Sequence, residues 1–147
     1  SKNDAKVTVV GVIDKPGIAA NIFEQLIKNN INIDMVIQNT SSDGKKTDVT
    51  FTIKREDLNK TLSLTKENKK NLNYEKIIHD DNVSKVSIIG AGMIANPGVT
   101  YKMFRSLANE KINILAISTS EIKISVLINE SMTQKAVKTL HKTFELD

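Results

Sequence analysis

The glycines at positions 90 and 92 are the residues that most directly suggest chemistry in this chain. They belong to Gly90-Ala91-Gly92-Met93-Ile94-Ala95, which follows a predicted strand and matches the G-x-G-x-x-G/A pattern of dinucleotide-binding loops. In that pattern the third small residue lies in the first turn of a helix that faces a pyrophosphate. Here Pro97-Gly98 follows almost at once and would break the helix, and the next predicted strand has apolar Leu115 and Ile117 where a ribose-binding carboxylate is needed. We therefore predict that this segment binds no nucleotide.

Residues for catalysis or metal binding are scarce. The chain has no cysteine, which excludes a disulfide scaffold, a thiolate zinc site and a cysteine nucleophile. His79 precedes Asp80-Asp81, a group that could hold a metal or relay a proton, but a polar strand end leading into a linker is the simpler interpretation. His141, the other imidazole, lies beside the apolar stripe of the last predicted helix. With no nucleophile elbow, Walker loop or paired acids at helical spacing, we expect no catalytic residue, no metal and no cofactor.

A binding site is the stronger interpretation. Pro16-Gly17 and Pro97-Gly98 each form a tight turn before a predicted helix, where free backbone N–H groups and the helix dipole attract a carboxylate. Asp14, Asp34 and Glu121 could pair with an ammonium group. A helix N-terminus beside a carboxylate suits a free amino acid, which is anionic at one end and cationic at the other. The alternative, that Asp14 only caps the turn, is equally compatible with the spacing.

The two turns belong to an internal repeat. Pro97 follows Pro16 by 81 residues, and Ile114 follows Ile33 by the same 81, with no gap between. Two copies are too few for a solenoid, so we interpret the chain as a duplicated small domain with boundaries at 1–82 and 83–147.

Hydrophobic periodicity predicts the order β-α-β-β-α-β in the first copy. Its helix has apolar residues at three- and four-residue spacing, namely Ile18, Ile22, Phe23, Leu26 and Ile27. Alternating residues predict strands, and Asp43-Gly44 predicts a hairpin between two of them. The expected elements are a strand that ends at Gly11, a helix from Ile18, strands at 31–37 and 48–53, a helix at 56–69 and a strand at 74–78.

The second copy repeats this order less completely. Expected are strands at 85–89, 112–117 and 122–128, a helix at 99–109, and a last helix capped by Ser131 that carries Ala136, Val137, Leu140 and Phe144. The final strand is missing or reduced to Glu145-Leu146, unless a neighbouring segment completes that sheet. The predicted fold class is therefore α+β, with two tandem ferredoxin-like units. Units this small bury little apolar surface, so we expect the copies to pair and the chain to dimerise.

Composition points to a globular protein, with 39% hydrophobic and 26% charged residues among 147. Lysines 66, 69, 70 and 76 contribute to a net charge of +4, but a solvated helix face and loop explain them. An RNA-binding sheet would need aromatic residues on adjacent strands, and the chain has only four Phe and two Tyr, so we expect no nucleic acid. No apolar run has membrane-spanning length and the N-terminus is polar, so we expect no membrane contact and a cytoplasmic location.

Across almost its whole length, the chain resembles the regulatory region of aspartate kinase (aspartokinase), the enzyme that opens the lysine, threonine and methionine pathway. The matching stretches are Val9-Val10-Gly11-Val12, Asp14-Lys15-Pro16-Gly17-Ile18-Ala19-Ala20, Asn32-Ile33-Asp34-Met35-Val36, Gln38-Asn39, Thr47-Asp48-Val49-Thr50-Phe51-Thr52, Lys85-Val86-Ser87, Gly90-Ala91-Gly92-Met93, Pro97-Gly98-Val99, Asn113-Ile114 and Ile117-Ser118-Thr119-Ser120-Glu121-Ile122.

The resemblance implies two tandem ACT domains that form a homodimer and bind allosteric amino acids where a first-copy domain meets a second-copy domain, typically that of the partner chain. The effector-binding residues it implies are Asp14, Gly17, Ile18, Ala19 and Gln38, completed by Asn113 and Ile114 in a threonine-type site. Ser41, Thr50, Ser120 and Glu121 match positions tied to the lysine response or to a second effector pocket. Lys111 stands where relatives often have a small polar residue, which leaves the effector open between threonine and lysine.

The kinase domain of that family, including its Lys-Phe-Gly-Gly opening, is absent from this sequence. We therefore expect a regulatory subunit or an excised fragment, and a start at Ser1 favours the fragment. Its expected partner is the aspartokinase catalytic domain or subunit, which effector binding would hold inactive as feedback inhibition. The alternatives are a free-standing ACT pair that senses amino acids for another enzyme or transcription system, a nucleotide-using enzyme, and an RNA-binding ferredoxin-like domain.

Overall fold

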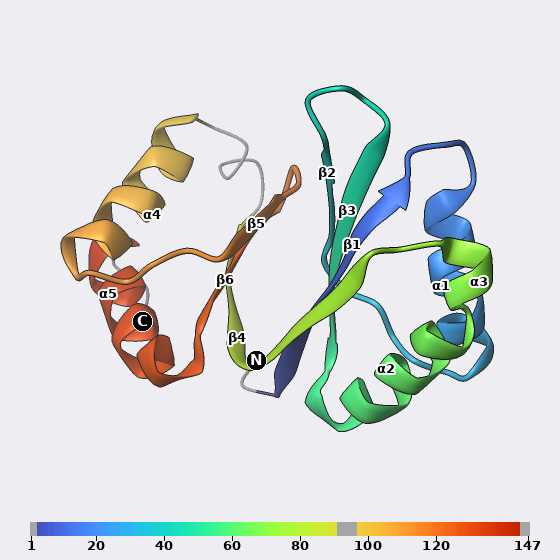
Figure 1. Cartoon of the computed structure of the whole chain (residues 1–147). Coiled ribbons are helices and arrows are strands. Elements are labelled where there is room, and N and C mark those ends of the chain that lie inside the picture. Colours follow the sequence, from blue (N-terminus) through green and yellow to red (C-terminus); the bar gives the residue numbers. More distant parts are fainter. Residues whose placement is uncertain (1–2, 91–96, 145–147) are drawn as a thin grey trace. The chain divides into compact units, whose positions relative to one another are not determined.

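The chain divides into two compact units between Asp81 and Asn82. The computed structural model describes residues 3–90 and 97–144 (Figure 1). Each unit is a sheet with helices on one face, as the sequence predicts for two ferredoxin-like units.

The first unit contains β1 (Asp4–Ile13), α1 (Ile18–Lys28), β2 (Val36–Thr40), β3 (Lys46–Lys54), α2 (Leu58–Glu67), α3 (Lys69–Leu72) and the first part of β4 (Lys76–Ile89). Its strands lie in the order β2-β3-β1-β4, and β3 pairs antiparallel with both β1 and β2. Figure 1 shows α1, α2 and α3 on one face of these strands.

The core of the first unit lies between that face and the helices. Val7, Val9 and Phe51 are fully buried, and the Phe23 ring meets the Phe51 ring edge-on with centroids 5.1 Å apart. Ile27, which the helical spacing places in the core, is 64% exposed, so that prediction was wrong. Ile18, Ile22 and Leu26 alone form the fully buried stripe of α1, because Ile27 lies at the border of this stripe, on the solvent side.

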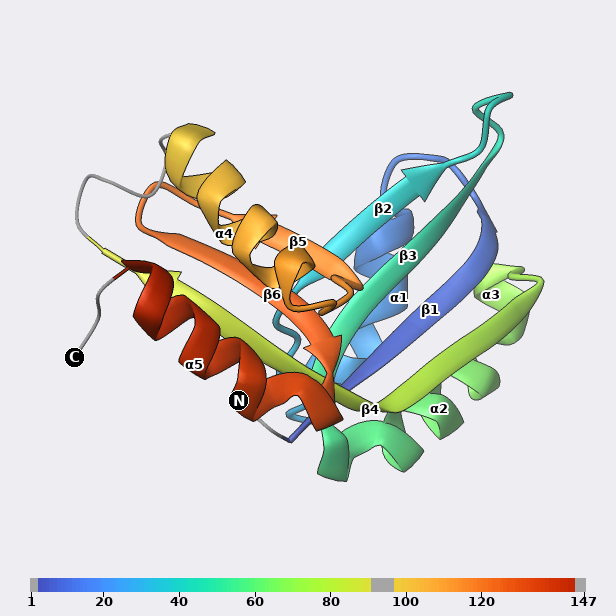
Figure 2. The same ribbon diagram turned by 90° about the vertical axis from the view of Figure 1, so that its left-hand side faces the viewer.

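The second unit contains the remainder of β4, α4 (Pro97–Asn109), β5 (Ala116–Thr119), β6 (Lys123–Asn129) and α5 (Thr133–Phe144), in the strand order β4-β6-β5. Figure 2 shows α4 and α5 covering one face of these strands. Met103, Leu107, Ile124 and Val126 are fully buried between them, whereas Val137 of α5 is 40% exposed and lies outside the core predicted for it. The final strand predicted at Glu145-Leu146 lies outside the described residues.

Two strands begin later than the alternating pattern indicates. The strand predicted at 31–37 begins at Val36, and the one predicted at 112–117 begins at Ala116. Before Val36 the ladder is irregular, since the Met35 N–H donates to the Thr52 side chain at 2.9 Å and not to a strand carbonyl. Ile31 and Met35 are buried all the same, so their spacing records burial and not strand pairing.

The linker predicted at His79-Asp80-Asp81 is wrong, because these residues lie inside β4, which runs unbroken from Lys76 to Ile89. His79 and Asp81 are exposed and Asp80 is half-buried, so this part of the strand has no apolar alternation that would reveal it.

Helix and strand ends differ from prediction for local reasons. α4 begins at Pro97 and not at 99, because proline is well tolerated at the first helical position, where its missing N–H has no intrahelical partner. The predicted cap, Ser131, does not begin the helical segment. Asn129 takes that place, and its side chain accepts the Ser131 N–H at 3.0 Å in the 3-10 turn before α5. The predicted helix at 56–69 is divided into a 3-10 turn (Arg55–Asp57), α2 and α3.

Candidate functional site

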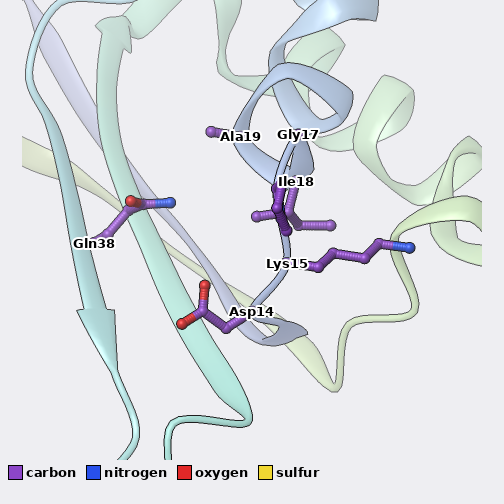
Figure 3. Close-up of a pocket in the computed structure, with 7 residues that line it drawn as sticks. Asp14, Lys15, Gly17, Ile18, Ala19 and Gln38 are labelled. Atoms are coloured by element: carbon purple, nitrogen blue, oxygen red, sulfur yellow. The ribbon is translucent and has the colours of Figure 1, made fainter.

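A hollow of about 450 Å³ lies between the loop after β1, the start of α1 and the edge strand β2. Its lining consists of Asp14, Lys15, Pro16, Gly17, Ile18, Ala19 and Gln38. Figure 3 shows the Asp14 carboxylate and the Gln38 amide on the same side of the loop, in the space beside the start of α1, whereas Lys15 extends to the other side. The structure thus brings together the five first-copy residues that the resemblance implies.

The loop is shaped by its anchors and by Pro16-Gly17. The Asp14 N–H donates to the Lys45 carbonyl at 3.0 Å, which holds the end of β1 against the β2–β3 hairpin. Gly17 has φ of 85°, a left-handed conformation that glycine adopts without strain, and it directly precedes α1. The Asn21 N–H donates to the Gly17 carbonyl at 3.0 Å and closes the first turn.

No side chain caps the start of α1. The first N–H groups of a helix have no intrahelical partner, so Ala19 and Ala20 present theirs at the positive end of the helix dipole. Asp14 is exposed, and the start of α1 has no side-chain cap, so the Asp14 carboxylate is not engaged in capping this helix. The hollow therefore has an anion-attracting end at α1 and an anionic side chain at Asp14.

Gln38 reaches the hollow because of its register in β2. Gln38 pairs with Val49, and Val36, two residues earlier in β2, pairs with the buried Phe51. Residues two apart in a strand share a face, so Gln38 and Val36 both lie on the face that the helices cover. β2 is the edge of the sheet, and Val36 there is 47% exposed. Gln38 therefore places an amide, which can both donate and accept hydrogen bonds, at the open side of the hollow.

Ser41 and Thr50 do not line the hollow. The Ser41 hydroxyl donates to the Asp43 carboxylate at 2.7 Å, and this bond lowers the pKa of Asp43. The same hydroxyl accepts the Lys46 N–H at 3.1 Å, and both bonds shape the hairpin turn. Thr50 lies on the opposite sheet face, where its hydroxyl hydrogen bonds to that of Thr8 at 2.9 Å. The lysine-response role of both stays a prediction.

The other implied residues belong to the second unit. Asn113 is exposed, whereas Ile114 is partly buried and packs against the core of the second unit. Ser120 closes the β5–β6 turn, donating its N–H to the Lys123 carbonyl at 2.7 Å, and Glu121 lies exposed within that turn. The roles of these four residues stay predictions.

Lys111 has a structural reason for its conformation. Its φ is 60°, as is that of Asn30 at the equivalent place in the first copy. Each residue directly precedes a buried isoleucine after a helix, and a left-handed residue is the usual way to end one. The position acts as a helix terminator in both copies.

Three other features bear on function: metal-binding groups, the glycine motif and membrane-spanning helices. Among residues 3–90 and 97–144 the structure has no group of three or more His, Asp or Glu side chains that could hold a metal ion. The glycine motif at 90–95 lies, apart from Gly90, outside the described residues. Within that same part of the chain, no helix is both long enough and apolar enough to cross a membrane.

The family model of the ACT domain matches residues 7–68 and 86–144. Among curated proteins, the chain is 48% identical to the aspartokinase of Corynebacterium efficiens over 147 residues, which is 99% of this chain and 35% of that protein. It is 44% identical to the aspartokinase of Pseudomonas aeruginosa, over 100% of this chain and 35% of the relative. The chain thus spans about a third of the length of these relatives.

Solved structures of aspartokinases are also similar to this chain. A structure of aspartokinase alpha and beta subunits has a TM-score of 0.91 at 46% identity, with 99% of this chain and 95% of that chain covered. The ligand-free regulatory subunit of aspartate kinase from Thermus thermophilus has a TM-score of 0.89 at 32% identity, with 98% and 94% covered. Aspartokinase III from E. coli in complex with lysine and aspartate has a TM-score of 0.69 at 19% identity, with 95% and 31% covered, and this likeness shows the fold alone.

Proposed function

This chain belongs to the ACT domain family, as the regulatory ACT-domain part of an aspartokinase, and from that premise we propose that it binds threonine or lysine in the hollow beside α1. The effector's carboxylate lies at the uncapped N-terminus of α1, where Ala19 presents its N–H group. Its ammonium group pairs with Asp14, and Gln38 hydrogen bonds to one of its polar ends.

One observation carries this proposal. An exposed carboxylate, Asp14, and a helix start without a side-chain cap line the same hollow. These are the two opposite charges that a free amino acid carries, set on one loop whose ends are anchored at Lys45 and in α1. A ligand with only one of the two charges would leave one of these groups without its partner.

The remaining parts of the site belong to the same proposal. The two ACT domains span 1–82 and 83–147, the chain forms a homodimer, and Asn113 and Ile114 of a second-copy domain complete the threonine-type site. Ser41, Thr50, Ser120 and Glu121 serve the lysine response. The partner is the aspartokinase catalytic domain or subunit, in the cytoplasm.

Regulation then follows from differential affinity. An effector shifts the equilibrium between two arrangements of the ACT dimer only if it binds one of them more tightly. The arrangement that binds the effector holds the kinase inactive, so the end products of the pathway inhibit its first step. The same coupling requires that the catalytic partner change the affinity for the effector by an equal factor.

A thermal-shift screen of the chain against the twenty amino acids tests the proposal. A ligand at 100 times its dissociation constant stabilises the native state by about 2.7 kcal/mol, which raises the melting temperature by roughly 5 to 10 °C for a chain of this size. Threonine or lysine should give such a shift, while D-threonine and a lysine analogue without the carboxylate should not. A chain whose melting temperature responds to no amino acid would contradict the proposed function.

A further inference from the structure

β1 contains a bulge next to the hollow. Val9 pairs with Val49 and Val12 pairs with Thr47, so Val10 and Gly11 together oppose the single residue Asp48 on β3. Gly11 has φ of 75°, as expected where a bulge needs a left-handed residue. The strand that the sequence predicts to end at Gly11 continues through the bulge to Ile13.

One carboxylate accepts a hydrogen bond from this bulge, and a second carboxylate side chain lies against it. The half-buried Asp48 accepts the Gly11 N–H at 3.0 Å, which satisfies a donor that the bulge removes from the ladder. On the other side, the Glu75 side chain fills the space that a Cβ of Gly11 would occupy, with its Cδ only 2.6 Å from that position. The Glu75 N–H also donates to the Val10 carbonyl at 2.8 Å, so backbone and side chain of Glu75 both contact the bulge.

Glu75, whose side chain lies over Gly11, forms an exposed ion pair with a lysine. Its carboxylate accepts from the Lys46 ammonium at 2.7 Å. The hydrogen bond from Lys46 holds the pKa of Glu75 below its usual value, and Glu75 raises the pKa of Lys46 in turn. Lys46 pairs with Ile13 in the ladder, and its neighbour Lys45 accepts the Asp14 N–H. The bulge, the ion pair and Asp14 are therefore linked within a few residues.

The second copy offers an internal comparison. Gly90 follows the first strand of the second copy, as Gly11 follows the apolar start of β1 in the first copy. Nevertheless, β4 and β6 pair in regular register from Val83 to Ile89, with Ile89 opposite Lys123. Lys123 stands where the first copy has Asp48, and the Gly90 N–H donates to the Ile122 carbonyl at 3.0 Å. Within the described residues the second copy reaches Gly90 in regular register, whereas in the first copy a carboxylate lies opposite the glycine and the strand is bulged.

We propose that Asp48 and Glu75 are positioning residues of the effector site, which fix the Gly11 bulge and thereby set the Asp14 carboxylate against the start of α1. This inference rests on the proposed function, since Asp14 is the group that receives the effector's ammonium. A bulge bends its strand and redirects the residues that follow it. Losing the Asp48 carboxylate, or the ion pair between Glu75 and Lys46, lets the loop at 12–17 move and shifts Asp14 relative to the start of α1.

Calorimetric titration of threonine and lysine into single variants of the chain tests the proposal. Asp48→Ala removes the acceptor and should weaken effector binding about 10-fold, because a binding site must be held within about 0.5 Å. Asp48→Asn keeps a side-chain oxygen that can accept the Gly11 N–H and should stay within about 3-fold of the original chain. Equal losses in the two variants would overturn the role of Asp48.

The ion pair provides a second test that does not depend on Asp48. Lys46→Glu and Glu75→Lys should each weaken binding, and the double variant that exchanges the two charges should restore it. Urea unfolding midpoints, measured alongside, separate a moved loop from an unfolded unit. Unrestored binding in the double variant would overturn the role of Glu75.

The outcomes also distinguish this inference from the function on which it rests. If the unaltered chain binds neither amino acid, both are overturned. If it binds one of them and Asp14→Ala weakens that binding while Asp48→Ala and Glu75→Lys do not, the positioning role alone is overturned.

Discussion

Replacement of Asp14 by alanine is expected to weaken the binding of threonine or lysine about 10- to 100-fold. A hydrogen bond to a charged group contributes about 1.5–3 kcal/mol, and each 1.4 kcal/mol changes a dissociation constant about tenfold. Asp14 is the only carboxylate that lines the hollow within the described residues, so the effector's ammonium has no substitute there. Isothermal titration calorimetry gives the affinities directly.

The matched control is Glu56→Ala, which removes an exposed carboxylate of the same unit away from the hollow. It should leave the affinity unchanged. Neither substitution should alter the unfolding midpoint appreciably, because both side chains are exposed and Asp14 caps no helix. Equal affinities in the Asp14 and Glu56 variants would remove Asp14 from the site.

Replacement of Phe51 by alanine is expected to destabilise the first unit by about 3–5 kcal/mol. Phe51 is fully buried on β3 and packs edge-on against Phe23, so its loss leaves a cavity between sheet and helices. Urea unfolding followed by circular dichroism measures the change in the free energy of unfolding. Effector binding should decrease as the first unit unfolds, because the edge strand β2, which contains Gln38, pairs with β3.

Ile27→Ala is the control for this substitution. Periodicity places Ile27 in the core, but its side chain is 64% exposed, so the free energy of unfolding should change by no more than about 0.5 kcal/mol. A loss of several kcal/mol in this variant would show that the helical face assigned to the core is incorrect.

The sequence predicted the repeated order of elements, and the closeness of Asp14 to the start of α1, because both are local. Burial repeats along a helix or strand, and Pro16-Gly17 must break the chain before α1 whatever packs around it. Asp14, Gly17, Ile18 and Ala19 were therefore placed together correctly, since only a few residues separate them. Gln38 joins them through the register of β2, and its inclusion came from the family resemblance and not from its spacing.

Features that depend on pairing partners could not be predicted in this way. The bulge at Gly11 depends on Asp48 and Glu75, which are distant in sequence, while Val10 and Gly11 leave the apolar pattern unbroken. β4 passes unbroken through Asp80 because ladder hydrogen bonds, and not apolar burial, define it there. Each of these features arises from contacts between residues far apart in the chain.

Backbone amide NMR of the isotope-labelled chain, titrated with threonine and separately with lysine, tests the central claim most directly. The account predicts that one of the two shifts the amide signals of Asp14, Gly17, Ile18 and Ala19 in a saturable way, and that Asp14→Ala abolishes the shift at the same concentrations. Saturable shifts confined to amides outside the hollow, or none with either amino acid, would contradict it.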